Sequence, residues 1–243
     1  MSGNEDVFRA ERYERQMNLL GESGQKALRE STATVVGLGG LGSPAATYLT
    51  AAGFGRLVLV DYDEVTPSNL NRQVLHGSDD VDRKKTRSAR EKLKELDPEI
   101  ELETCELELE KDNVEELPET DLVLGAVDNF RVRYLLNEYA VREKIPYIHG
   151  AVKGFNGQLM TVIPGKTACL RCTFPEGAPE REGIQVLGPT AGVVGTMMAN
   201  EAIKYVTGVG QTEEELLLLN LKENKFEPVG VSRVPDCPVC GDL

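Results

Sequence analysis

The sequence predicts an α/β protein with a doubly wound, Rossmann-like sheet that is mostly parallel and ends in antiparallel strands. Residues 33–37 (ATVVG) are typical of a buried strand, 44–52 of a helix, and 57–60 of a second buried strand. Strand and helix patterns go on alternating to about residue 150, as they do in parallel sheets built from βαβ units. Residues 215–232 then alternate like two antiparallel strands.

Further elements follow from the same periodicities. Between 100 and 109 apolar residues alternate with glutamates, which predicts a solvated edge strand, and the alternation switches phase midway, which predicts a bulge or break. The remaining expected elements are two short helices within 5–30, helices at 83–96, 132–141 and 190–206, strands at 122–124, 147–148 and 158–163, and a crossing loop at 173–189.

Size and charge restrict the class of protein. A chain of 243 residues suits one domain with appendages. The formal charge of −13 opposes binding to nucleic acid or anionic membrane and favours a partner with a basic face. The N-terminal stretch is charged, and no segment approaches the roughly 18 apolar residues of a membrane span. We therefore expect a cytoplasmic protein that contacts neither membrane nor nucleic acid.

Four of the five cysteines form two Cys-x-x-Cys pairs, Cys169/Cys172 and Cys237/Cys240. In a chain without a leader such pairs predict metal ligands before disulfides. Four thiolates satisfy tetrahedral zinc and leave no open position for a substrate. The sequence thus predicts a structural zinc site, with Cys105 left over.

The pattern Gly37-x-Gly39-x-x-Gly42 follows the first strand. Ser43 is a plausible N-cap and Pro44 a plausible first helical residue, so the turn opens directly into a helix. Such a turn presents backbone N–H groups and the positive helix end to phosphate. No Gly-Lys-Ser/Thr follows, which excludes a P-loop.

Asp61 closes the second strand, where a carboxylate can accept both hydroxyls of a ribose. Asp63 is the alternative ribose ligand, or it only caps the turn. Up to this point a dehydrogenase that uses NAD fits equally well. The next segment favours ATP, because Asn69, Arg72 and Gln73, and then Lys84 and Lys85, put polar and positive groups where a triphosphate would lie. For Lys84, a role as a solubilising surface base is an equal alternative.

Asp128 and Asn129 follow the strand at 122–124, and open α/β sheets bind ligands at such carboxyl ends. A carboxylate there is a candidate ligand for Mg²⁺ on the triphosphate. The alternative is that Asp128 caps the helix that begins near Phe130. The two histidines, His76 and His149, have no metal-ligand spacing, and we expect each to serve in hydrogen bonding or in the core.

From Arg12 to Gly241 the chain resembles the ThiF/MoeB/HesA family, the bacterial and archaeal relatives of the ubiquitin-activating enzymes, and it is closest in type to MoeB. The matching motifs, in chain order, are Arg12-Tyr-Glu-Arg15-Gln16, Gly37-x-Gly-Gly-Leu-Gly42, Asp61-Tyr-Asp63, Ser68-Asn-Leu-Asn-Arg72-Gln73, Asp128-Asn129, Cys169-Leu-Arg-Cys172 and Cys237-Pro-Val-Cys240.

The resemblance implies a homodimeric adenylyltransferase that uses ATP with Mg²⁺ and contains Zn²⁺. Its substrate would be the C-terminal Gly-Gly carboxylate of a small ubiquitin-fold sulfur carrier, similar to MoaD, ThiS or an archaeal ubiquitin-like modifier. Such carriers serve molybdopterin and thiamine biosynthesis and tRNA thiolation. By position, Arg72, Lys85, Asp128 and, from the neighbouring protomer, Arg15 would be catalytic. The nucleotide would bind Gly37, Gly39, Gly40, Leu41, Gly42, Asp61, Asp63, Asn69, Arg72, Gln73, Lys85, Asp128 and Asn129.

The expected domain plan is a single adenylation domain over 1–243, with N-terminal helices at 1–30, a nucleotide-binding region at 31–150 and a carrier-binding region at 151–243. One departure from the family is informative: many relatives hold the carrier as a thioester on a crossing-loop cysteine, and no cysteine lies between Cys172 and Cys237. We expect adenylation alone. The chain stops soon after Cys240, so sulfur would come from a separate cysteine desulfurase or rhodanese-type donor.

Other activities remain open from the sequence. Within the family, the alternatives are a tRNA-modifying dehydratase, which the negative charge disfavours, and an enzyme that adenylates a peptide. Outside it, the chain could be a nucleotide-bound scaffold without turnover, but Arg72, Lys85 and Asp128 together argue against that. A dehydrogenase fits less well, since no substrate domain with an acid–base pair is evident.

Overall fold

The computed structural model describes residues 2–175 and 185–243, with side chains from residue 11 onward. Its strands form one eight-stranded sheet in the order β3-β2-β1-β4-β5-β6-β7-β8. The first five in that order are parallel and the last three antiparallel, which confirms the predicted sheet. The strands are β1 Thr32–Val36, β2 Arg56–Val60, β3 Glu101–Cys105, β4 Leu122–Gly125, β5 Tyr147–Lys153, β6 Asn156–Val162, β7 Leu216–Asn220 and β8 Lys225–Val229.

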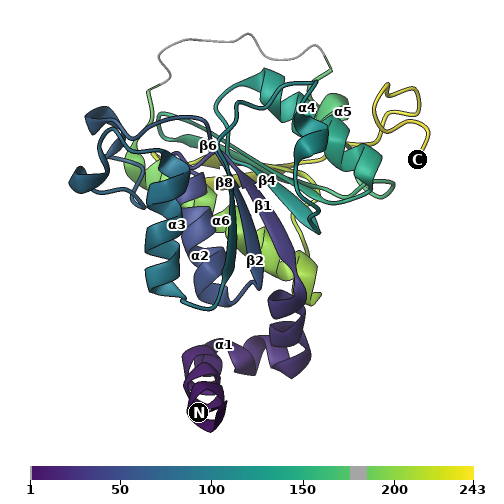
Figure 1. The fold of residues 1–243 in the computed structure, drawn as a ribbon. Helices are drawn as coiled ribbons and strands as arrows, with labels where there is room; N and C mark the ends of the chain where they lie inside the picture. Colours follow the sequence, from purple (N-terminus) through teal and green to yellow (C-terminus); the bar gives the residue numbers. More distant parts are fainter. Residues whose placement is uncertain (1, 176–184) are drawn as a thin grey trace.

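Helices cover both faces of the sheet (Figure 1), as the doubly wound prediction requires. One hydrophobic cluster packs α2, α3 and α6 against the sheet, and the other packs α4, α5 and the cysteine pairs against the opposite face. The α-helices are α1 Ser2–Glu30, α2 Gly42–Ala52, α3 Lys85–Leu96, α4 Phe130–Glu143, α5 Leu170–Thr173 and α6 Gly188–Thr207, and short 3₁₀ helices cover Pro67–Asn69, Ser78–Asp80 and Val114–Glu116.

The N-terminal segment is two helices joined at Gly21, whose φ of 69° and ψ of 173° break the helical path. The bend is visible in α1 in Figure 1. A positive φ costs little at glycine, which explains why the break falls there. The prediction of two helical patterns before the first core strand is therefore confirmed.

The glutamate-rich strand is at the edge of the sheet, as predicted, where β3 pairs only with β2 among the described residues. It ends at Cys105, so the expectation of a strand to residue 109 is wrong in its second half. The phase switch in the alternation marks this end. Leu109 leaves the sheet and joins the core under α4.

The strand order places the functional loops. The chain leaves β1 toward β2 and β3, then crosses over to β4 on the other side of β1. The carboxyl ends of β1 and β4 therefore lie next to each other at the point where the order reverses, the usual ligand site of open α/β sheets. Gly37 follows β1, and residues 126–128 follow β4.

The middle of the predicted crossing loop, 176–184, lies outside the described residues. Just after it, Gly154 donates a backbone hydrogen bond to Gln185 (2.7 Å), which ties the loop's far end to the turn between β5 and β6. In the ranges that the structure describes, no helix is long and apolar enough to cross a membrane.

Candidate active site

A cavity of about 1240 Å³ opens at the carboxyl ends of β1, β2 and β4. It exceeds the roughly 300–1,000 Å³ of most small-molecule sites, which leaves room for a nucleotide and part of a second substrate. Most of the predicted nucleotide ligands line it: Gly37, Gly39, Gly40, Asp61, Asp63, Asn69, Arg72, Gln73, Lys85, Asp128 and Asn129.

Leu41 and Gly42, in contrast, support the turn from behind. Leu41 is buried in the core. A Cβ on Gly42 would lie 1.8 Å from the carbonyl oxygen of Gly37, so only glycine fits there. Gly37 has a φ of 89°, and a Cβ on it would meet the Ala126 carbonyl oxygen at 2.7 Å. These glycines are needed for close packing of the turn against α2 and the loop after β4.

The predicted capping of α2 is wrong. The helix begins at Gly42 with Leu41 as its N-cap and no side-chain cap hydrogen bond, so Ser43 and Pro44 both lie inside the first turn. The Ser43 hydroxyl instead donates to the Leu38 carbonyl (3.1 Å). Without a side-chain cap, the N-terminus of α2 keeps N–H groups for an anionic ligand.

Asp61 fastens the glycine turn to β2. Its Oδ2 accepts from Leu38 N (2.7 Å) and its Oδ1 from Asp63 N (2.8 Å). Burial raises the carboxyl pKa, opposed by Lys85 and by these two N–H donors. Each oxygen retains a lone pair for a further donor, such as a ribose hydroxyl.

Asp63 pairs with Lys85, the first residue of α3. The Lys85 ammonium is almost fully buried and lies 2.7 Å from Asp63 Oδ2 and 3.9 Å from Asp61 Oδ2. Asp63 therefore positions the ammonium at the mouth of the glycine turn. Lys84 does not line the cavity; it reaches Glu64 (3.2 Å) and the Tyr62 carbonyl.

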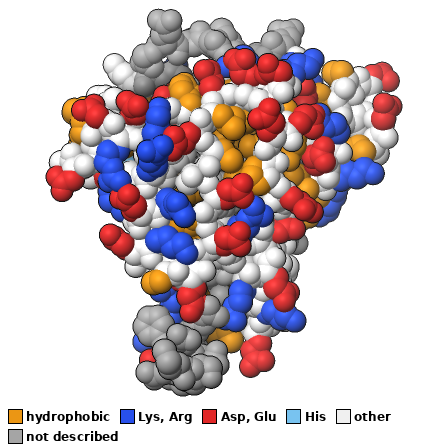
Figure 2. Space-filling view, in the orientation of Figure 1, with side chains coloured by type: hydrophobic (Ala, Val, Ile, Leu, Met, Phe, Trp, Pro, Cys, Tyr) orange, Lys and Arg blue, Asp and Glu red, His pale blue; other side chains and the backbone are white. Residues whose placement is uncertain are grey.

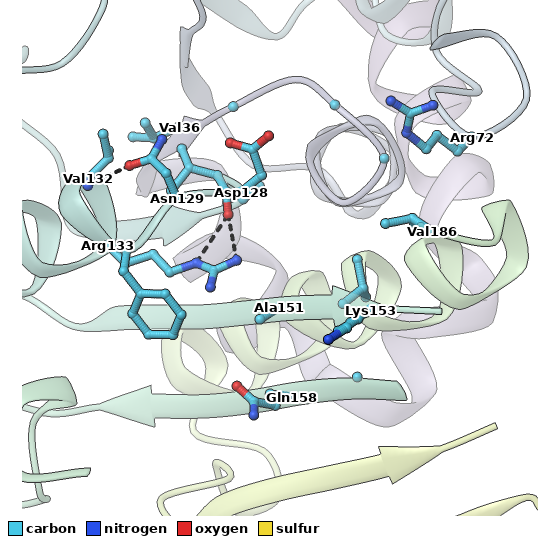
Figure 3. A pocket seen from close by; sticks show the side chains of 18 of the residues that line it. Val36, Arg72, Asp128, Asn129, Val132, Arg133, Ala151, Lys153, Gln158 and Val186 are labelled. Atoms are coloured by element: carbon cyan, nitrogen blue, oxygen red, sulfur yellow. Dashed lines mark hydrogen bonds between the residues drawn. The ribbon is translucent and has the colours of Figure 1, made fainter. Parts of the chain in front are cut away.

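Arg72 lies across the cavity from Arg133, with Asp128 between them (Figure 3). Its Nη1 donates to the Ser68 carbonyl (2.8 Å) and to Asn71 Oδ1 (3.1 Å), which steadies the side chain. Gln73 is 4% exposed, and its Oε1 has no hydrogen-bond partner within the described chain. An unpaired acceptor beside the cavity calls for a donor from a ligand or water.

Asn129, and not Asp128, caps α4: Asn129 Oδ1 accepts from Val132 N at 2.9 Å. The alternative role for Asp128 as the helix cap is therefore wrong. The Asp128 carboxylate is exposed into the cavity (Figure 3) and makes no hydrogen bond or ion pair with any described residue. A free carboxylate in the same cavity as a glycine turn that could bind phosphate is suited to bind a divalent cation.

The four predicted cysteine ligands come together behind α4. Their sulfur atoms all lie within 4.8 Å of one another, with separations of 3.9 Å (Cys169–Cys172), 3.7 Å (Cys169–Cys237) and 3.5 Å (Cys172–Cys240). Tetrahedral zinc with Zn–S bonds near 2.3 Å requires sulfurs about 3.8 Å apart, so the donor set fits zinc. Cys105 lies elsewhere, half-buried on β3, where burial raises its thiol pKa.

In the Arg12–Gln16 motif, three side chains bond to the rest of the protein and Arg15 does not. Tyr13 donates to Asp97 (3.2 Å), the Arg12 guanidinium to the Leu96 carbonyl (2.8 Å), and the Gln16 amide to the Ala52 carbonyl (2.8 Å). Arg15 is exposed and does not line the cavity of its own chain. These three side chains hold this helix so that Arg15 projects outward.

Sequence reasoning missed Arg133, which lines the cavity beside Asp128 and is 6% exposed. The spacing of five residues from Asp128 was the available signal, since a side chain in the first helical turn points back toward the helix N-terminus. His76 donates from Nε2 to the Leu38 carbonyl (3.1 Å) and bonds Ser88 through Nδ1 (2.9 Å), so its predicted hydrogen-bonding role is confirmed. Burial lowers its pKa to about 4.

The family model described as the ThiF family matches residues 13–239. The chain belongs to the ThiF family. It is 42% identical to the SAMP-activating enzyme E1 of Haloferax volcanii, over 98% of this chain and 91% of that one. It is 39% identical to the sulfur carrier protein ThiS adenylyltransferase of Escherichia coli, over 95% and 94%. Among solved structures, E. coli MccB with ATP superposes with a TM-score of 0.85 at 25% identity, covering 95% of this chain and 74% of that one.

Proposed function

We propose that this protein adenylates the C-terminal Gly-Gly carboxylate of a small ubiquitin-fold sulfur carrier. A carboxylate oxygen of the carrier attacks the α-phosphorus of ATP, the bond from that phosphorus to the bridging oxygen breaks, and pyrophosphate leaves. The observation that carries the proposal is that Asp61, Lys85, Arg72 and Asp128 line one cavity together with the glycine turn. Identity of about 40% to carrier-activating relatives over nearly the whole chain supports the same activity.

Each side chain has a role that its position supports. Asp61, already fixed by two backbone N–H groups, accepts the ribose hydroxyls. Lys85 and Arg72 stabilise the charge that builds on the phosphates as pyrophosphate leaves. Asp128 holds Mg²⁺, which neutralises the triphosphate when bound.

A peptide substrate is the rival within the family. MccB, a microcin C7 biosynthetic enzyme solved with N-formylated MccA, shares the fold. Its identity to this chain is 25%, against 42% and 39% for the two carrier-activating relatives. The higher identity favours a ubiquitin-fold carrier.

The homodimer belongs to the same proposal. Arg15 is exposed on a firmly anchored helix and takes no part in its own cavity, so its contribution to catalysis requires a second protomer. The zinc site has a structural role, because it links residues 169–172 to residues 237–240. A separate donor protein supplies the sulfur. Because no cysteine lies between Cys172 and Cys237, the crossing loop does not hold the carrier as a thioester.

Carrier-dependent exchange of labelled pyrophosphate into ATP tests the proposal. Exchange is expected with carriers that end in Gly-Gly and not with the same carriers lacking the last glycine. Arg72→Ala and Asp128→Ala are each expected to lower the exchange at least about 10²-fold, as removal of one transition-state donor does. Lys84→Ala, next to Lys85 but outside the cavity, is the matched control and should stay near the unaltered rate.

The proposal fails if no Gly-Gly carrier supports exchange, or if the shortened carriers support it equally. A separate outcome concerns the missing crossing-loop cysteine: incubation with ATP and carrier should yield no covalent adduct that thiols release. Isolation of such an adduct would contradict adenylation without a thioester.

A further inference from the structure

Arg133 holds a positive charge deep in the wall of the cavity. Its side chain is 6% exposed, and its guanidinium carbon lies 4.9 Å from the centre of the Phe130 ring. Its Nε and Nη2 both donate to the Val127 carbonyl, at 3.1 Å and 2.8 Å. These bonds fix the guanidinium directly beneath the segment that carries Asp128 (Figure 3).

The charge lacks a matching anion in the protein. No carboxylate of the described chain lies within ion-pair distance of Arg133, whereas Lys85, the other buried cation of the described residues, lies near two. The nearby Tyr147 and His149 supply no compensation: burial raises the phenol pKa and lowers the imidazole pKa to about 3, so both are neutral at pH 7. The exposed Asp128 carboxylate favours the charged guanidinium without forming an ion pair or a hydrogen bond with it.

The environment penalises this arrangement. Burial lowers the pKa of the Arg133 guanidinium, which means that the surroundings disfavour its charged form. A buried charge is normally paired, because leaving it unpaired costs several kcal/mol by order of magnitude. An unpaired guanidinium in a cavity wall therefore indicates that the missing anion arrives with a ligand.

The remaining nitrogen is available for that anion. Nε and Nη2 bond to Val127, which leaves Nη1, and Nη1 is not one of the fully buried atoms without a partner. It points toward β5, on the side opposite Val127 (Figure 3). Cavity residues Ala151 and Gln158 lie on that side, on β5 and β6. Nη1 thus faces the space between the Asp128 carboxylate and the antiparallel part of the sheet.

We propose that Arg133 binds an oxyanion of the reacting substrates, either the α-phosphate of the nucleotide or the terminal carboxylate of the acyl donor. A guanidinium recognises both in the same way, through charge-assisted N–H···O bonds. The inference rests on the proposed function for the identity of the acyl donor, but not for the nucleotide.

Two pairs of ligands distinguish the α-phosphate from the terminal carboxylate as the anion that Arg133 binds. AMP and adenosine differ only in the α-phosphate, and their affinities are measured by titration calorimetry in EDTA so that the Mg²⁺ role of Asp128 does not enter. A Gly-Gly carrier and the same carrier with a C-terminal amide differ only in the terminal charge. The variant is Arg133→Gln, and the matched control is Arg131→Gln, two residues earlier on α4, where the side chain is half-exposed and pairs with Glu108 and Glu110.

If the anion is the α-phosphate, Arg133→Gln reduces the preference for AMP over adenosine about tenfold or more, the usual effect of one charged hydrogen bond. If it is the carboxylate, the AMP preference persists and the preference for the free carrier over its amide falls by a similar factor. Arg131→Gln retains both preferences. Persistence of both preferences in Arg133→Gln overturns the inference.

If Arg133→Gln does not fold, Arg133→Lys replaces it in the test. A lysine ammonium keeps the positive charge but cannot hydrogen-bond to the Val127 carbonyl and to an anion at once, as a planar guanidinium can. If no Gly-Gly carrier binds the unaltered enzyme, the proposed function fails. The AMP and adenosine titrations then decide on Arg133 alone, with loss of the AMP preference in its favour and retention against it.

Discussion

Gly42→Ala probes the closest backbone contact of the glycine turn. A Cβ at this position would lie 1.8 Å from the Gly37 carbonyl oxygen, whereas real Cβ contacts essentially never fall below 3.0 Å. The backbone segments at Gly37 and Gly42 must therefore move apart by roughly 1.2 Å. That movement breaks the bond from Leu38 N to Asp61 (2.7 Å) and the bond from Ser43 N to Gly39 O (2.9 Å). With a charged acceptor in the first, the expected loss of folding stability is about 2–4.5 kcal/mol.

Urea unfolding followed by circular dichroism measures this loss, and nucleotide titration measures the accompanying fall in affinity. Gly192→Ala, inside α6, is the matched control. A Cβ there meets nothing within 4 Å, so the substitution should stabilise the protein by about 0.5–1 kcal/mol through helix propensity. A stability of Gly42→Ala within about 0.5 kcal/mol of the unaltered protein would refute the steric reasoning.

Three further outcomes follow from the cap, a histidine and the cysteine cluster. Asn129→Ala should lower stability by about 1 kcal/mol in urea unfolding, with Asn129→Asp close to unaltered, because the bond to Val132 caps α4. His76 has its pKa lowered to about 4, so below the unfolded value of 6.5 the unfolded chain binds more protons; stability should fall between pH 6.5 and 4, and this dependence should weaken in His76→Asn. Cys237→Ser should abolish zinc binding in metal analysis and lower the melting temperature, whereas Cys105→Ser should leave zinc content unchanged.

Figure 2 shows how charged and apolar side chains are distributed on one face of the molecule. Acidic and basic side chains are mixed there, with apolar side chains gathered between them in the upper half. The net charge of −13 favours a partner with a basic face.

Much of the site was predictable because its parts are local. A period of two or 3.6 residues identified most strands and helices, a glycine turn between strand and helix marked the phosphate end, and the two cysteine pairs marked a metal site. The errors are also local. Leu41 and not Ser43 is the N-cap residue of α2, and Asn129 rather than Asp128 caps α4. Small differences in backbone direction decide which neighbouring side chain reaches the free N–H groups.

The sequence by itself determined the kinds of element and the residue types at their ends. Only the tertiary structure decided which ends meet: β4 pairs with β1, and so Asp128 shares a cavity with a glycine turn some ninety residues earlier. Likewise only packing buried Arg133 without a carboxylate partner while Lys85 obtained two. Periodicity reflects contacts within a few residues, whereas strand order and charge pairing depend on contacts between distant segments that no local pattern encodes.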